Sequence, residues 1–386
     1  MKIRLFLILL AALIFTTALY SCIEVPAPGS GTESDTSEAT GSDNGIVVDP
    51  NEKSMDDPDF DYDSYIVLPD YSSFSVNVRE KQDFTADDAD DVIDSILASS
   101  GFVVKVDALD TVAAGQVVSI DFDSMIDGEE YSGGSQNDFC LIIGSDSFVP
   151  ELERALVGRK VGDEFEVTAR YPEDYSVSTI AGKTADFSVT VNYIGHLMDV
   201  TDELIDEATG GLYKTVEGFR SYLIDYNNAV SELIFEEELY SRTWELLYDH
   251  SEIKDVPVID RVKYCDSLVE YYTAYAKANN ATYAEFTEAQ GYTEEEFYDY
   301  LYRELSLEAV ERKLILSAVA EREGISFELT NGERDELLRN YYYYYDVDSY
   351  LEFSSMVGAL SAQDLCDYCL VMNKITSEID IIVSEE

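Results

Sequence analysis

Hydrophobic and polar positions alternate with a period of two between residues 115 and 197, the pattern of β-strands that bury one face. The strand-like runs are short and rich in β-branched residues, and Asp-Gly and Gly-Gly turns separate them. One helical stretch, residues 151–156, interrupts the series. The pattern predicts a small antiparallel sheet with one inserted helix.

Beyond residue 197 the hydrophobic period becomes 3.6 and stays helical to the end. Long helices are predicted over residues 217–249, 257–279 and 297–324, the last ended by Gly324. Three capping boxes start further helices: Thr282 with Glu285, Thr293 with Glu296, and Thr330 with Glu333. Residues 198–386 are therefore predicted to be all-α, and the fold class is α+β.

Two segments precede the predicted sheet. Residues 65–114 carry two strand patterns and a helix that begins at a Thr85–Asp88 capping box, so we interpret them as a β-α connector. Residues 23–64 are polar and acidic, and this composition predicts a disordered linker. Alternating Asp residues at 57–63 suggest a calcium loop, but Tyr62 stands where such a loop needs Gly, which favours a solvated linker.

The first 22 residues have the pattern of a bacterial export signal. Lys2 and Arg4 precede an apolar run that is too short to span a membrane comfortably. The run ends in Leu-Tyr-Ser followed by Cys22, which resembles a lipobox with Cys22 as the lipidated residue; Tyr20 departs from the usual small or aliphatic residue. The alternative is a plain secretory signal. With lipidation, the protein would be anchored on the extracytoplasmic side of the cell membrane.

The chain is strongly acidic, with 79 Asp and Glu against 25 Lys and Arg among 386 residues and a formal charge of −54. Such a charge repels nucleic acid and anionic lipid headgroups. It therefore excludes nucleic acid as a partner and argues against ribosome binding. Hydrophobic residues still make up 46% of the chain, enough for buried cores.

The order of motifs in residues 115–197 resembles the FKBP-type peptidyl-prolyl isomerase domain of the trigger factor family. The motifs are the Asp-Phe pair at 121–122, Asp-Gly-Glu-Glu-Tyr at 127–131, and Tyr-Pro-Glu-Asp-Tyr at 171–175. Residues 198–386 resemble the C-terminal chaperone domain of the same family. The family's ribosome-docking N-terminal domain has no counterpart before residue 65.

The resemblance implies a set of pocket residues and a mechanism that needs no cofactor. Phe122, Phe139 and Phe187 would be aromatic walls, and the Val149 amide would bind a substrate carbonyl. The implied set is Phe122, Tyr131, Phe139, Phe148, Val149, Leu152, Tyr175 and Phe187. Leu152, Ser132 and Ala155 depart from an aromatic, an acidic residue and a glycine in the family. The alternative is that these aromatics only fill the core of the domain.

Rotation about an X–Pro bond needs no nucleophile or general base. Its barrier of about 18–20 kcal/mol comes from lost amide resonance, and an apolar pocket that prefers the twisted imide lowers this barrier by differential binding. His196 and His250 are far apart in sequence, which argues against a histidine-based site. Cys366 and Cys369 have redox or zinc spacing, but without a second pair they indicate buried core residues.

These patterns predict an isomerase that also acts as an ATP-independent chaperone for exported, unfolded, proline-containing polypeptides. The first alternative is a holdase whose isomerase pocket has decayed. The second is an adhesin or solute-binding lipoprotein, which no motif supports. The run from Tyr341 to Tyr345 is expected either on a client-binding surface or in packing between helices.

Overall fold

A computed structural model describes residues 46–106, 111–145, 148–171, 177 and 179–384. Two compact units account for these residues, and each is considered by itself. The sheet unit comprises residues 81–232, and the helical unit comprises the described residues before 81 and after 232. The predicted signal segment and Cys22 lie outside the described residues.

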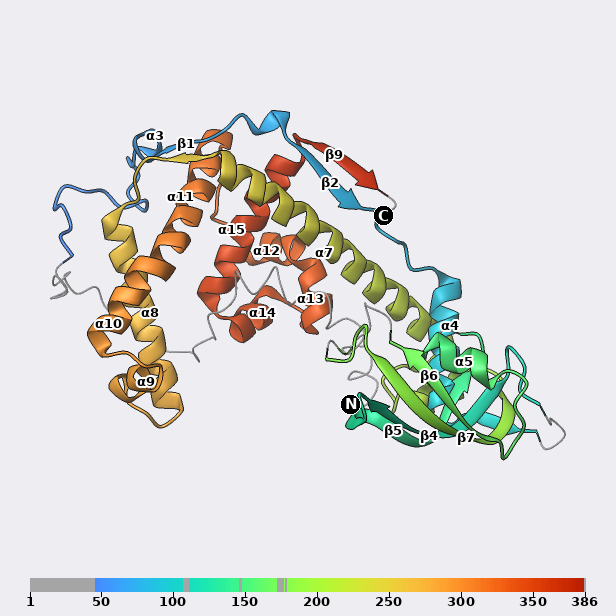
Figure 1. The fold of residues 1–386 in the computed structure, drawn as a ribbon. Coiled ribbons are helices and arrows are strands. Elements are labelled where there is room, and N and C mark those ends of the chain that lie inside the picture. The colour runs from blue at the N-terminus through green and yellow to red at the C-terminus, as the bar shows by residue number, and fades with distance from the viewer. Residues whose placement is uncertain (1–45, 107–110, 146–147, 172–176, 178, 385–386) are drawn as a thin grey trace. The chain divides into compact units, whose positions relative to one another are not determined.

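The sheet unit contains a five-stranded antiparallel sheet in which β7 is central (Figure 1). Along its path the order is β3–β7–β4–β5, and β6 also pairs with β7. The strands are β3 (Val103–Lys105), β4 (Val117–Ile126), β5 (Glu129–Ile142), β6 (Glu164–Arg170) and β7 (Thr184–Leu197). The inserted helix is α5 (Pro150–Leu156), in the place the sequence predicts.

Both faces of the sheet carry apolar side chains, which explains why the start of β4 is buried on successive residues. Val118, Ile120 and Phe122 alternate into the main core under α5, together with the alternating residues of β7. Val117 points the other way and packs with Ala98 of α4 (Ala86–Ser99). Helix α4 therefore covers part of the opposite face.

A second core in the sheet unit consists of helices. Ile93 and Leu97 of α4 pack with Ile205 of α6 (Asp202–Ala208) and with Phe219 and Leu223 of α7 (Val216–His250). The boundaries of the units therefore fall near residues 80 and 232, whereas the sequence pattern placed boundaries at 114 and 197. Periodicity identifies each helix but carries no signal for which distant helix it packs against.

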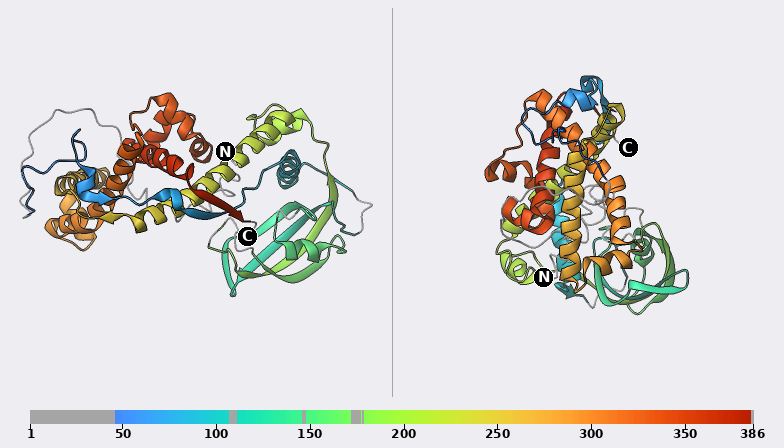
Figure 2. Two further views of the ribbon diagram at one scale, coloured as in Figure 1. Left: turned by 90° about the horizontal axis from the view of Figure 1, so that it is seen from above. Right: turned by 90° about the vertical axis from the view of Figure 1, so that its left-hand side faces the viewer.

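The helical unit is built from the rest of α7 and the elements around it (Figures 1 and 2). Its helices are α3 (Tyr62–Tyr65), a 3-10 turn (Tyr71–Ser73), α8 (Val258–Ala278), α9 (Tyr283–Ala289), α10 (Glu294–Tyr300), a π-helical turn (Leu301–Leu305), α11 (Ser306–Glu323), α12 (Asn331–Leu337), α13 (Arg339–Tyr345), α14 (Tyr350–Val357) and α15 (Ala359–Thr376). Its strands form two pairs: β1 (Ile66–Val67) with β8 (Glu252–Ile253), and β2 (Ser75–Arg79) with β9 (Asp380–Ser384). The capping boxes predicted at Thr85, Thr282, Thr293 and Thr330 are all present.

The disordered-linker prediction for residues 23–64 is wrong for its described part, residues 46–64, which pack onto the helical unit. Met55 and Phe60 are 7% and 5% exposed. The buried Asp260 carboxylate of α8 accepts hydrogen bonds from the Ser54 hydroxyl at 2.6 Å and the Met55 amide at 2.9 Å. Both Glu52 carboxylate oxygens accept backbone N–H groups at the start of α8. The average composition of a segment gives no information on specific hydrogen-bond partners elsewhere in the chain, so it could not predict this packing.

The tyrosine run lies on α13 and is mostly packed. Tyr341 and Tyr342 are buried, the Tyr341 hydroxyl donates to Glu237, and the Tyr345 ring lies 5.3 Å from that of Phe353. Only Tyr343 of this run reaches 36% exposure. The structure thus favours the packing interpretation over a client-binding surface.

Cys366 and Cys369 are both buried on α15. Burial raises the pKa of the Cys366 thiol to about 12, which disfavours the thiolate that metal binding and disulfide exchange require. Within the described residues, no helix combines the length and the apolar character needed to cross a membrane.

Gly195 of β7 sets the approach of β3, and its replacement tests the sheet. A Cβ there would lie 2.5 Å from the Val104 carbonyl oxygen, which belongs to backbone. We expect Gly195→Ala to destabilise the sheet unit by about 1–3 kcal/mol, measured as a lower melting temperature by calorimetry. The control is Gly332→Ala on α12, where a Cβ meets nothing within 4 Å and helix propensity predicts a small gain. Equal stability of Gly195→Ala and the parent chain would contradict this account of the β3–β7 contact.

Candidate functional site

Six aromatic side chains from different elements of the sheet unit form one continuous cluster. Phe122 of β4 is its hub, with ring centroids 5.7 Å from Phe139 of β5, 5.5 Å from Phe148 and 6.0 Å from Phe187 of β7. Tyr171, which follows β6, lies 6.2 Å from Phe187, and Tyr131 of β5 packs edge-on against Tyr171. Tilted and edge-on geometries are those that aromatic pairs prefer.

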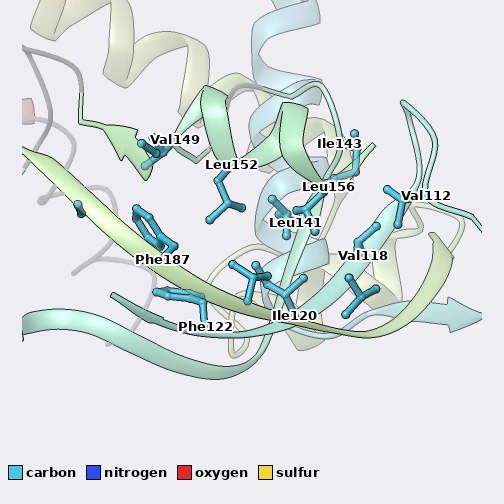
Figure 3. Close-up of a cluster of buried hydrophobic side chains, with 14 of the residues drawn as sticks. Val112, Val118, Ile120, Phe122, Leu141, Ile143, Val149, Leu152, Leu156 and Phe187 are labelled. Atoms are coloured by element: carbon cyan, nitrogen blue, oxygen red, sulfur yellow. The ribbon is translucent and has the colours of Figure 1, made fainter. Parts of the chain in front are cut away.

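The cluster has a buried layer and a layer that reaches solvent. Phe122 and Phe187 are 4% and 1% exposed, and Val149 and Leu152 at the α5 side are fully buried (Figure 3). The partly exposed aromatic residues packed against this layer include Tyr131, Phe139 and Phe148. The buried layer serves as core, as the alternative interpretation proposed, while the outer residues can touch a ligand. The structure thus separates the predicted set into core residues and residues that a ligand could reach, and the ligand-binding role of the latter stays a prediction.

The turn before α5 is held by one buried carboxylate. Glu153, 3% exposed, accepts hydrogen bonds from the Gly144 amide at 2.9 Å and the Phe148 amide at 3.1 Å. The Val149 carbonyl accepts the first N–H groups of the helix, whereas the Val149 amide has no partner among the residues that the structure describes. The family resemblance assigns this N–H to a substrate carbonyl, but Val149 is 0% exposed, so neighbouring side chains cover the amide in this structure. Glu153 is not among the residues predicted from the sequence, although an acid in the first turn of a helix is a usable signal.

Three hydroxyl groups form a chain beside the cluster. The Tyr131 hydroxyl lies 2.6 Å from the Ser124 hydroxyl and 2.8 Å from the Tyr171 hydroxyl, and Ser124 donates to the Gly134 carbonyl at 2.7 Å. The chain fixes the orientation of both tyrosine rings. Tyr171 and Ser124 were missed from sequence, because Tyr171 was read only as part of a turn motif.

The remaining predicted residues are placed as follows. Tyr175 lies outside the described residues, and so does the side chain of Ser132. Leu152, where the family has an aromatic, is fully buried beneath the cluster, and Ala155 on α5 is partly exposed. Among the described residues, no group of His, Cys, Asp and Glu side chains could hold a metal ion. The assignment of the site residues stays a prediction.

Comparison with known proteins agrees with this arrangement. Residues 110–207 match the family of FKBP-type peptidyl-prolyl cis-trans isomerases. The trigger factor of Streptococcus pyogenes serotype M2 (strain MGAS10270) is 27% identical over 320 residues, which is 81% of this chain and 67% of that protein. The trigger factor of Leuconostoc citreum (strain KM20) is 29% identical over 257 residues, 65% of this chain and 58% of that protein.

The chain is similar to trigger factors over most of its length. Its sheet unit carries an FKBP-type peptidyl-prolyl isomerase domain, hereafter the isomerase domain (residues 110–207), and the aromatic cluster lies in that domain. A solved structure of the trigger factor chaperone, from work on its promiscuous substrate recognition in folding and assembly, covers 80% of this chain at 17% identity with a TM-score of 0.33.

Glu153 should be required for the geometry of the turn that carries Val149. Glu153→Gln keeps the shape but leaves one amide facing an NH2 group, so we expect a loss of about 1.5–3 kcal/mol in the stability of the isomerase domain and slower catalysis. The measurements are thermal unfolding and a proline-limited refolding assay. The control, Glu151→Gln, makes the same charge change on the same helix at a half-exposed residue that pairs with Arg154. Indistinguishable behaviour of the two variants would remove Glu153 from the site.

Proposed function

We propose that this trigger factor relative is an exported, lipid-anchored peptidyl-prolyl isomerase and ATP-independent chaperone for exported polypeptides on the extracytoplasmic side of the cell membrane. The isomerase and chaperone classes follow from the family. The observation that carries the proposal for the site is the partly exposed layer of the aromatic cluster.

The geometry fits catalysis by differential binding. Phe139, Phe148 and Tyr131 offer apolar surface to a proline ring, and no ionisable group is needed to break a bond. Loss of amide conjugation in the twisted state makes the imide less polar, so an apolar, water-poor surface binds that state better than the planar one. The Val149 N–H would hold the carbonyl of the residue bonded to proline while the bond turns.

Chaperone activity is proposed for the helical unit. Around α8, α9 and α10, tyrosine and phenylalanine rings pack in a continuous group that runs through Phe286 and Phe297. Its outer members, Tyr275, Tyr292 and Tyr300, are 43%, 38% and 37% exposed. Such rings bury apolar area against a client at low cost in conformational entropy, and their hydroxyls tolerate polar neighbours. This suits binding to many unfolded sequences.

A lipid on Cys22 would tether this machinery to the membrane. The segment that follows, from residue 46, is fixed to α8 through Glu52 and Asp260. The intervening chain could span at most about 80 Å. A single anchor of this kind therefore keeps the helical unit near the membrane, where exported chains emerge unfolded.

The alternative function is a holdase without isomerase activity. The observation that favours it is Leu152, which fills the place of an aromatic beneath the cluster and is fully buried. A leucine has less apolar area than an aromatic ring, so the cluster would offer a weaker support for a bound proline ring. The substitution would then lower the affinity for the proline ring without changing the fold. Activity measurements separate the two functions.

Phe139→Ala in the full chain should lower kcat/KM for a proline-containing peptide by about tenfold or more, because about 1.4 kcal/mol of lost contact is a factor of ten. Suppression of client aggregation should be retained. The matched control is Phe165→Ala on β6: Phe165 is also partly exposed and packs on the same core, but lies outside the aromatic cluster. If the parent chain does not accelerate proline isomerisation while still suppressing aggregation, the holdase function replaces the isomerase.

Cys22 should decide the location. In a bacterial host, the mature chain should begin at Cys22 and partition into detergent, whereas Cys22→Ala should be released or remain an uncleaved precursor. Mass spectrometry of the N-terminus and detergent partitioning measure both. Cys140→Ala, a change at a buried cysteine, is the control and should leave partitioning unchanged. A mature protein that keeps Met1 and stays in the cytosol would end the export proposal.

A further inference from the structure

Strand β9 presents an apolar edge that nothing in the described part of the chain covers. All five of its residues are exposed, and the three central ones, Ile381, Ile382 and Val383, are 39%, 50% and 52% exposed. One edge pairs in parallel with β2, whose Val76 and Val78 are buried (Figure 1). Proteins commonly protect such edges with charge, proline or a covering element, and β9 has none of these within the strand interior.

The register identifies which backbone groups point away from β2. The Asp380 amide donates to the Phe74 carbonyl at 3.1 Å, and the Glu80 amide donates to the Ser384 carbonyl at 3.0 Å. In a parallel pair, a strand bonds to one neighbour through alternate residues, so residues 380, 382 and 384 face β2. The N–H and C=O groups of Ile381 and Val383 therefore face outward, and they have no partner among the described residues.

The charges around this edge specify the kind of occupant. Asp380 and Glu80 are exposed acids near the two ends of the pair. The nearby cations are already engaged, Arg79 with Glu238 and Lys374 with Glu323 and Glu378. A second copy of the chain would bring the same acids against each other, on top of a net charge of −54. An incoming strand with basic and apolar residues would find complementary charge and apolar contact.

We propose that β9 is a strand-addition site for extended client polypeptides that carry alternating apolar and basic residues. The client pairs with the outward N–H and C=O groups of Ile381 and Val383, and its apolar and basic side chains meet the exposed apolar residues of β9 and the acids near its ends. This inference rests on the proposed chaperone function and names one of its client-binding surfaces.

The test uses the full chain and a fluorescein-labelled ten-residue peptide of alternating Val and Lys, without proline, followed by fluorescence anisotropy. Val383→Pro removes an outward donor and leaves the bonds to β2 intact, since proline is tolerated where the N–H faces solvent. We expect it to weaken binding by about tenfold or more, the effect of about 1.4 kcal/mol. Val383→Thr is the matched control: it keeps the donor and the branched Cβ, and it should bind within about threefold of the parent.

A second peptide of the same sequence, N-methylated at every central residue, tests the backbone contribution from the client side. It keeps charge and apolar surface but lacks N–H donors on both edges, so the parent chain should bind it as weakly as Val383→Pro binds the unmethylated peptide. Aggregation suppression and isomerase activity are measured on every variant, because β9 is separate in sequence from the isomerase domain.

The edge proposal would be overturned if Val383→Pro bound the peptide as tightly as the parent chain does and the parent chain bound the methylated peptide equally well. A parent chain that suppresses aggregation but does not bind the peptide would also overturn it, while leaving the chaperone function intact. A parent chain that does neither would overturn the chaperone function itself. If the parent chain sediments as a dimer and Val383→Pro sediments as a monomer, the occupant of the edge is a second copy of the chain and not a client.

Discussion

Backbone pairing of β7 with three other strands holds the sheet of the sheet unit together. One edge of β7 pairs with β4 along most of its length, and the other pairs first with β6 and then with β3. The first half of β7 places Phe187 in the aromatic cluster. The second half contains Gly195, whose lack of a side chain lets the backbone of β3 approach closely. A strand that is bonded on both edges cannot shift its register without losing both ladders. This constraint fixes the buried ring on which the outer aromatic residues rest.

Carboxylates that accept backbone N–H groups are a second recurring feature of the chain. Glu153 holds the turn before α5, Glu52 receives the first N–H groups of α8, and Asp260 holds the segment at Ser54. Four capping boxes use Asp or Glu in the same way. Negative charge at a helix N-terminus also interacts favourably with the helix dipole. Some of the many acidic residues therefore stabilise the fold through hydrogen bonds to backbone N–H groups. Only the other acidic residues act mainly through charge repulsion.

Local patterns predicted the local structure well. The capping boxes, the long helix of residues 216–250 and the helix end at Gly324 follow from rules that need only neighbouring residues. What failed depends on distant partners: the packing of residues 46–64 on α8, the parallel pairing of β2 with β9, and the core shared by α4, α6 and α7. In the site, family motifs led to the aromatic cluster. They missed Glu153 and the Ser124–Tyr131–Tyr171 hydroxyl chain, because Glu153 and Ser124 are not part of the motifs and the Tyr131–Tyr171 contact joins residues 40 positions apart.

The two kinds of surface on the chain suit clients that must also be released. In the proposed modes of binding, the outer aromatic residues of the isomerase domain would contact client side chains, whereas the β9 edge would offer the N–H and C=O groups of only two residues. Each hydrogen bond contributes about 0.5–1.5 kcal/mol net, and ordering the client costs about 1–2 kcal/mol per backbone residue, so neither surface can bind tightly alone. Binding at one surface raises the effective concentration of the same client at another, provided that the client can span both. Weak contacts that add in this way can hold a long unfolded client at several segments. A folded client no longer exposes several segments, so it dissociates.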